Sequence, residues 1–286
     1  MKKIIILLLL YIFSSYQLLA QTTKIVLPGK TYTFEIKDGT NRSGRIDSIT
    51  ADYYYITNPA MGPDRIRKMG VSKIKEIQLA KDGTFANPHY SRYLFGPSAL
   101  PQAKGEVYFN NVDFEYNTIQ VGVTENLSVG VGGLLLTSLF SGNAVLLPNF
   151  KYAIKINEQS HIALGGLFLF LSGKSFGSNE SAALPFMVYT YGNAERNISV
   201  GAGWAHAGRG DWAPKPTGYV AGMKRFARNW VFQGEAYLLS NNTDNTIYIA
   251  TFRNVRPTSS WDFGVTRVKS GTVSFAIPLI GYTLKF

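Results

Sequence analysis

The chain has 286 residues, of which 45% are hydrophobic and 14% aromatic but only 16% are charged. About a quarter of a typical soluble domain is charged, and no long apolar run follows the first residues, so an ordinary soluble protein and a bundle of membrane-spanning helices are both disfavoured. The formal net charge is +11, but Lys and Arg are spread along the chain rather than gathered in one basic patch, so nucleic acid is not an expected partner.

Residues 1–20 have the pattern of an export signal. Lys2 and Lys3 precede the apolar run Ile4–Phe13, which is too short to span a bilayer. Cleavage is expected after Ala20, although Leu18 is larger than the small residue usual at that position. The sequence contains no cysteine, so neither disulfides nor a lipoprotein anchor is expected in the exported protein.

Residues 21–80 are expected to form a small periplasmic β module of five short strands. Thr31–Lys37 alternates apolar and polar residues, and Asp38-Gly39 after it predicts a tight turn. The pattern resembles an SH3-like or LSm-like small barrel. The basic run Arg65–Lys68 allows two interpretations. It is either a contact for peptidoglycan, lipid A or a periplasmic protein, or an edge strand kept unpaired by its charges.

Residues 81–104 are expected to be a connector, because Gly and Pro interrupt any regular pattern. Three phrases follow one another here: Arg92–Ala99 (RYLFGPSA), Lys104–Asn110 (KGEVYFN) and Gln120–Gly132 (QVGVTENLSVGVG). Together they resemble an uncharacterised family of Gram-negative, Bacteroidetes-type outer-membrane β-barrel proteins, over residues 87–286. The resemblance implies a β-barrel in the cell outer membrane, and it brings no activity and no catalytic residues.

Residues 105–286 repeat a unit of strand, short polar turn, strand and longer loop. The expected short turns are Thr124–Asn126, Asn157–Ser160, Asn193–Asn197, Ala227–Asn229 and Pro257–Ser260. They recur about every 30 residues, which is the hairpin period of a membrane barrel. The sequence therefore predicts an all-β protein whose main part is an antiparallel transmembrane β-barrel of about twelve strands.

Several of these strands separate into an apolar face, expected to meet lipid, and a polar or small face, expected to line the interior. In the last strand the apolar residues are Ile280, Tyr282, Leu284 and Phe286, which resembles the closing-strand signal that the barrel-assembly machinery reads. Segments 182–191 and 245–253 are ambiguous by this test. A soluble lipocalin-like or sandwich protein, with its apolar face inward, is the alternative.

The charged residues on the expected inner face form the candidate site. They are Glu106, Lys151, Lys155, Lys224, Glu235 and Asp262. Both signs of charge occur, so these side chains either cross-link a packed interior or line a narrow channel for small solutes. Outer-membrane lipid and lipopolysaccharide are the expected partners, with no cofactor.

The alternative function is an outer-membrane hydrolase that modifies lipid A or phospholipid, which needs a Ser nucleophile and a His base. The three histidines are His89, His161 and His206, and the best cluster is His206 with Arg209 and Asp211. His and Cys lack zinc-site spacing, whereas calcium at Asp211 or Asp244 stays possible. The sequence favours a non-enzymatic protein with an envelope structural role or a narrow channel.

Overall fold

The computed structural model describes residues 26–59, 61–77, 84–173, 180–208, 210, 212–239 and 245–286. The expected export signal lies outside these residues. The chain divides into two compact units, residues 1–77 and 78–286. Among the described residues, no helix has the length and apolar composition needed to cross a membrane.

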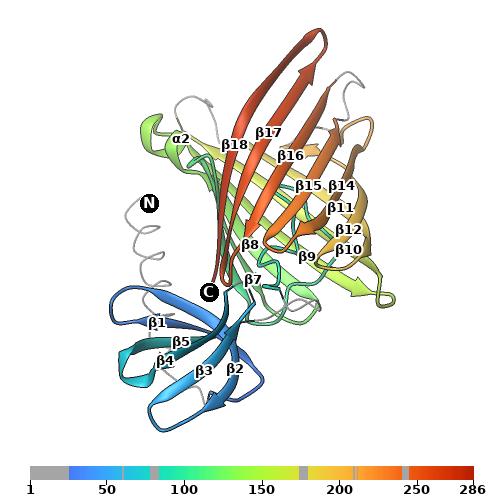
Figure 1. Ribbon diagram of the computed structural model, residues 1–286. Coiled ribbons are helices and arrows are strands. Elements are labelled where there is room, and N and C mark those ends of the chain that lie inside the picture. Colours follow the sequence, from blue (N-terminus) through green and yellow to red (C-terminus); the bar gives the residue numbers. More distant parts are fainter. Residues whose placement is uncertain are drawn as a thin grey trace. The chain divides into compact units, whose positions relative to one another are not determined.

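The first unit contains a five-stranded antiparallel sheet (Figure 1). Its strands are β1 Thr31–Ile36, β2 Asn41–Ile49, β3 Tyr53–Asn58, β4 Gly62–Arg67 and β5 Val71–Ile77. They lie in the order β4-β3-β2-β1-β5, so β1 pairs with both β2 and β5, and a 3-10 turn, Lys68–Gly70, precedes β5. The module's boundaries and its resemblance to an SH3-like or LSm-like barrel stay predictions.

The module's core follows from the alternation in β1. Tyr32 and Phe34 point to one face and pack with Ile46, Ile56 and Ile66 from the next three strands. The Asp38-Gly39 turn is closed by Asp38, whose Oδ1 accepts hydrogen bonds from the Thr40 Oγ1 at 2.6 Å and the Thr40 backbone N–H at 2.8 Å. These hydrogen bonds favour the carboxylate and lower the pKa of Asp38.

Phe34→Ala is expected to cost the module about 3–5 kcal/mol of unfolding free energy, because it leaves a cavity where a ring is 0% exposed. The matched change Tyr55→Ala removes a ring that is 38% exposed and should cost about 1 kcal/mol or less. Hydrogen exchange of the full chain measures both. The amides of β1–β5 should lose protection in Phe34→Ala only, and loss of protection throughout residues 84–286 would contradict the prediction.

The second unit is a closed antiparallel β-barrel (Figure 1). Its strands are β6 Val107–Val112, β7 Tyr116–Gly122, β8 Leu127–Leu134, β9 Ala144–Lys155, β10 Ser160–Ser172, β11 Glu180–Gly192, β12 Arg196–Gly203, β14 Thr217–Ala227, β15 Trp230–Leu238, β16 Thr246–Val255, β17 Ser259–Ser270 and β18 Val273–Lys285. Strand β18 closes the wall by pairing with β6, and the two-residue β13, His206–Ala207, pairs with β11. Among the described residues twelve strands thus form the wall, which confirms the predicted number.

All five predicted short turns are confirmed. They connect β7 to β8, β9 to β10, β11 to β12, β14 to β15 and β16 to β17. Because the strands are antiparallel, these turns share one end of the barrel, which we call the short-turn end. The connections after β8, β10, β12 and β15 share the opposite, long-loop end. The short helix α2, Leu135–Phe140, belongs to the first of them.

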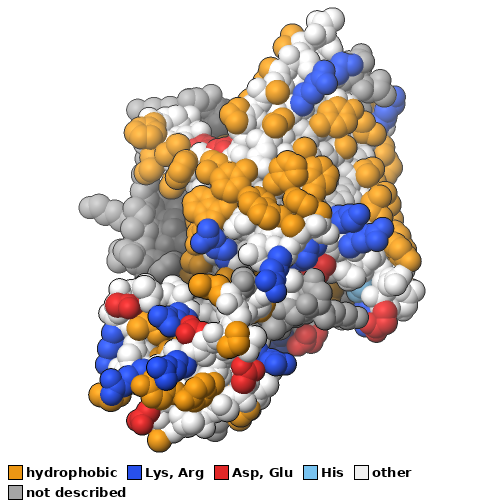
Figure 2. Space-filling model, viewed as in Figure 1, with side chains coloured by type: hydrophobic (Ala, Val, Ile, Leu, Met, Phe, Trp, Pro, Cys, Tyr) orange, Lys and Arg blue, Asp and Glu red, His pale blue; other side chains and the backbone are white. Residues whose placement is uncertain are grey.

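The outer face of the wall is apolar, as predicted. Exposed outward side chains include Val129, Phe150, Leu164, Val200, Val220, Phe232, Phe252 and Phe263. Figure 2 shows side chains of this kind as a broad band across the barrel. Buried side chains of the opposite parity include Thr118, Gln120, Ser128, Thr190, Ser199, Gln233, Thr251 and Thr283. This arrangement is the reverse of a lipocalin-like barrel. In β18, Tyr282 packs on Trp261 of the outer face, with ring centroids 4.7 Å apart.

The inner face is not polar throughout, and the expectation that it would be is wrong for the half nearer the long loops. There the inward side chains are Leu167, Leu184, Phe186, Ile247 and Val268. This explains why segments 182–191 and 245–253 were ambiguous. Both of their faces carry apolar residues, because one meets the outside and the other lines an apolar part of the interior.

Candidate functional site: a plugged interior

Residues 84–104, expected to be only a connector, pass through the interior of the barrel, and we call them the plug. Tyr93 and Ala99 are 0% exposed. The Tyr93 hydroxyl lies 2.5 Å from Asn197 Oδ1 and 2.8 Å from Ser199 Oγ, and the Ala99 N–H donates to Thr190 Oγ1 at 2.7 Å. The inward side chains of the wall therefore bind the plug directly.

The tip of the plug is a tight reversal at residues 93–96. The Tyr93 N–H donates to the Gly96 carbonyl at 2.9 Å, and Arg92 forms a β-bridge with Pro97. Gly96 lies against the ring of Tyr219, where an added Cβ would be 2.5 Å from a ring carbon. Any side chain at position 96 would therefore require the Tyr219 ring to shift.

Glu235, on the inner face of β15, holds this tip. Its carboxylate accepts the backbone N–H groups of Leu94 at 2.8 Å, Phe95 at 3.2 Å and Gly96 at 2.7 Å. The Tyr237 hydroxyl donates to the same carboxylate at 2.5 Å. A carboxylate that is only 4% exposed needs such donors, so the plug's backbone and Glu235 satisfy each other.

Lys151, on the inner face of β9, holds the plug from another side. Its Nζ donates to the carbonyls of Ser91, Ser98 and Leu100, each at 2.8 Å. All three ammonium protons are thereby directed at plug backbone. A buried lysine surrounded by neutral acceptors keeps the plug in place but leaves its charge without a carboxylate partner.

Arg253 and Asp262 form a buried ion pair beneath the plug, with Nε and Oδ1 2.8 Å apart and both side chains 0% exposed. Arg253 Nη1 also donates to the His89 carbonyl at 2.8 Å, and Gln233 Nε2 donates to Asp262 Oδ1 at 3.0 Å. Burial and the positive charge of Arg253 hold the pKa of His89 well below its usual range, so its imidazole stays neutral at pH 7. The sequence analysis missed Arg253, which lies in the ambiguous segment 245–253. The signal that could have found it is its position next to Phe252, because an apolar residue facing outward places its neighbour on the inner face.

The predicted interior residues divide into two groups. Lys151, Glu235 and Asp262 contact or underlie the plug as described above. Glu106 is also buried, and its carboxylate pairs with Lys285 Nζ at 3.2 Å and accepts the Tyr90 hydroxyl at 3.3 Å.

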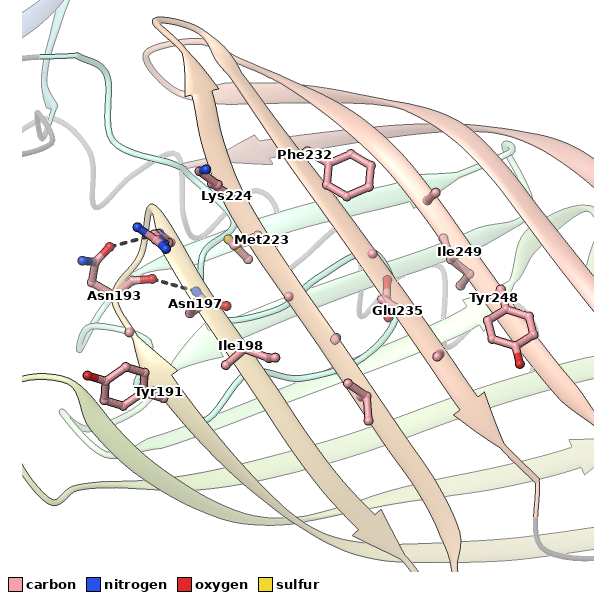
Figure 3. A pocket seen from close by; sticks show the side chains of 18 of the residues that line it. Tyr191, Asn193, Asn197, Ile198, Met223, Lys224, Phe232, Glu235, Tyr248 and Ile249 are labelled. Atoms are coloured by element: carbon pink, nitrogen blue, oxygen red, sulfur yellow. Dashed lines mark hydrogen bonds between the residues drawn. The ribbon is translucent and has the colours of Figure 1, made fainter. Parts of the chain in front are cut away.

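Lys155 and Lys224 do not lie in the interior, and both assignments are corrected. Lys155 is the last residue of β9 and is exposed, with its Nζ 2.5 Å from Glu158. Lys224 shares the outward parity of Val220, while Met223 beside it is buried (Figure 3). Small and apolar residues occupy both faces of β14, so its sequence pattern carried no marker of which face turns inward.

The cluster favoured for an enzyme is only partly described. The His206 ring packs edge-on against Trp212 at 4.9 Å, whereas Arg209, Asp211 and Asp244 lie outside the described residues. His89 Nδ1 lies 3.3 Å from Thr283 Oγ1 in the buried base of the plug. Within the described part of the chain, no group of three or more His, Asp or Glu is placed to hold a metal ion.

A cavity of about 450 Å³ lies between the plug and the inner face of the wall, mostly in the long-loop half of the barrel. Arg92, Phe95 and Pro97 of the plug line its floor together with Lys151. Most of its wall is apolar, formed by Leu167, Leu184, Phe186, Ile247, Ile249 and Val268, and Asn149, Thr217 and Thr266 add polar groups. A second, open hollow lies on the wall from β11 to β17, where Phe232 and Tyr248 point outward (Figure 3). The first is a candidate site for a small molecule, because its size falls within the usual range of such sites.

No protein-family model matches the chain, and no curated protein matches it. Among solved structures it is similar to the KdgM porin, with 10% identity, a TM-score of 0.44, and coverage of 63% of this chain and 98% of that one. It is also similar to the CymD monoaromatic hydrocarbon channel, with 10% identity, a TM-score of 0.36, and coverage of 91% and 89%. At such low identities and scores, any function must rest on this chain's own residues. The Bacteroidetes-type family stays an expectation.

Proposed function

We propose that the protein is a non-enzymatic β-barrel of the cell outer membrane and a narrow channel for small solutes, closed here by its own plug. The observation that carries the proposal is the closed wall with an apolar outer face, whose interior holds a hydrogen-bonded segment of the same chain below a cavity. A closed barrel leaves no unpaired strand edge, as a lipid environment requires.

Charges on the outer face support placement in a bilayer. Arg196 and Lys224 are register partners near the short-turn end, and both are exposed. Arg267 and Lys269 are exposed near the long-loop end of β17. Basic side chains on both sides of an apolar band suit anionic lipid headgroups on both surfaces. Short turns face the periplasm in such barrels, which would place the module of residues 26–77 there.

The chemistry of the plug's seat favours a channel over a permanently packed barrel. The seat, meaning the wall residues that hold the plug, binds plug backbone largely through hydrogen bonds: Lys151 and Arg253 donate to plug carbonyls, and Glu235 accepts from plug N–H groups. Water can replace such hydrogen bonds at a modest net cost once it enters the interior. A twelve-stranded barrel is also wider than the eight-stranded barrels that side chains alone can fill.

Gly96→Val is expected to raise solute passage, because its side chain would overlap the Tyr219 ring and unseat the tip of the plug. The matched control is Gly234→Val on β15, where the nearest atom to an added Cβ is 3.7 Å away. Swelling of proteoliposomes in a small neutral sugar measures passage. The rate should rise several-fold for Gly96→Val and stay at the wild-type value for Gly234→Val. If folded Gly96→Val and wild-type barrels both stay impermeable, the envelope structural role replaces the channel.

A further inference from the structure

We propose that the cavity above the plug binds an amphipathic monocarboxylate, with its apolar part against the wall and its carboxylate toward the floor. This inference deepens the proposed function, because it names the class of solute that the channel admits. It rests on three independent features: the apolar wall, two cations without a carboxylate partner at the floor, and an apolar path at the mouth.

The wall is unsuited to an empty, water-filled interior. Leu167, Leu184 and Phe186 come from β10 and β11, and Ile247 and Val268 come from β16 and β17 on another part of the wall. All five keep part of their surface exposed, although they point into the barrel. An apolar ligand would cover these side chains and release the water in contact with them, which is the main driving force for such binding.

The floor carries two cations with no carboxylate in direct contact, although Glu235 and Glu106 lie near enough to act on Arg92 and Lys151 through space. Arg92 donates from Nε at 3.1 Å and from Nη2 at 2.7 Å to the Phe95 carbonyl, and its Nη1 is buried with no hydrogen-bond partner. Lys151 donates only to carbonyls. Among the described residues, no carboxylate lies within ion-pair distance of either cation.

The nearby acids do not supply the missing anion. Glu235 directs both oxygens at the plug's N–H groups and the Tyr237 hydroxyl, and Glu106 pairs with Lys285. A buried cation is costly unless an anion lies beside it. A ligand carboxylate would provide that anion, and a guanidinium binds carboxylates well because it offers several N–H donors in one plane.

An apolar path leads from the mouth of the barrel to this cavity. Val273, Phe275 and Ile277 have the same parity in β18 as Leu279, which is buried inside the barrel. All three are exposed, and Phe275 is the register partner of Val268, which lines the cavity. A ligand chain can therefore move from one apolar contact to the next. A sugar would find few hydrogen-bond partners on this route.

The test is calorimetric titration of the full chain in lipid nanodiscs with octanoate, 1-octanol and octylammonium, with empty nanodiscs subtracted for partition into lipid. Wild-type protein should bind octanoate about tenfold more tightly than octanol, which corresponds to one additional charge-assisted contact of about 1.4 kcal/mol. Octylammonium should bind most weakly, because the floor is cationic.

Two variants locate the site. Leu167→Trp places an indole in the cavity and should weaken octanoate binding about tenfold, because the indole occupies the space that the octanoate chain needs. The matched change Leu164→Trp, on the outer face of the same strand, should leave binding unchanged. Arg92→Gln keeps a donor for the Phe95 carbonyl but removes the charge, so octanoate should lose its advantage over octanol.

Equal wild-type affinities for octanoate and octanol, or octanoate binding that Leu167→Trp leaves intact, would overturn the inference. Heat-dependent migration on gels reports whether each barrel is folded, and the two Trp variants decide the matter if Arg92→Gln does not fold. The binding result and the swelling result test different claims. A protein that passes sugar but does not prefer octanoate keeps its channel function, and one that binds octanoate without passing solute keeps only the site.

Discussion

Replacing residues 87–100 with a short Gly-Ser linker is expected to convert the protein into an open pore. The linker can connect the two cut ends because both lie at the short-turn end. The Phe85 carbonyl accepts from Arg225 Nη2 at 2.9 Å, and the Gly105 N–H donates to the Gly122 carbonyl at 2.8 Å. With the plug removed, Lys151, Glu235 and Arg253 would face water, which can solvate them. Conductance in planar bilayers should rise about tenfold or more over wild type, since a twelve-stranded barrel has room for water once emptied.

A single substitution that weakens the plug's attachment without removing the plug provides the control. Glu235→Gln keeps the size of the side chain but replaces one acceptor oxygen with a donor, so it cannot accept from Leu94, Phe95 and Gly96 as the carboxylate does. Its conductance should fall between wild type and the linker variant, with brief openings. A linker variant that folds and inserts, yet conducts no more than wild type, would show that the plug does not close the pore.

Arg253→Met is expected to lower the unfolding free energy of the barrel by about 3–5 kcal/mol, because removing one partner of a buried ion pair leaves the other charge unpaired. Asp262 would remain with both its oxygens in a fully buried site, and among the described residues Gln233 Nε2 alone would still donate to it. The carbonyl of His89 would lose its donor as well, so the base of the plug should loosen with the wall. Urea unfolding of the protein in lipid vesicles, followed by Trp fluorescence, measures the loss.

Two further variants show whether charge is the cause. Arg253→Met combined with Asp262→Asn removes both charges and should recover part of the lost stability, because no unpaired charge remains. Lys155→Met breaks the exposed pair with Glu158 and should cost about 1 kcal/mol or less. If the double variant is as unstable as the sum of its single changes, packing and not charge explains the effect.

Local pattern was enough for the wall of the barrel. The period of two in strands such as β7 and β12, and the polar turns between hairpins, depend only on neighbours in the chain. That is why the strand number, the five short turns and the apolar outer face were predictable. The alternation Ile280, Tyr282 and Leu284 likewise placed the last strand, which pairs with β6 in the structure.

The same reasoning failed where a residue's role depends on what lies opposite it. Lys224 was placed inside because its strand has no face that is plainly polar. Arg253 was overlooked because Ile247 and Ile249 on its own face made β16 look apolar on both sides. In each case the deciding information was the content of the interior beside the strand, which the strand's own sequence does not record.

By itself the sequence determined an all-β protein with a twelve-stranded barrel whose outer face is apolar, since strand, turn and face are properties of adjacent residues. Only the tertiary structure decided that the Gly- and Pro-rich segment before the barrel enters it. The reason is that Lys151 reaches Ser91 across 60 residues, and Arg253 reaches His89 across 164. Contacts over such separations form only when the wall has closed, and they divide the interior into a polar plug seat and an apolar cavity.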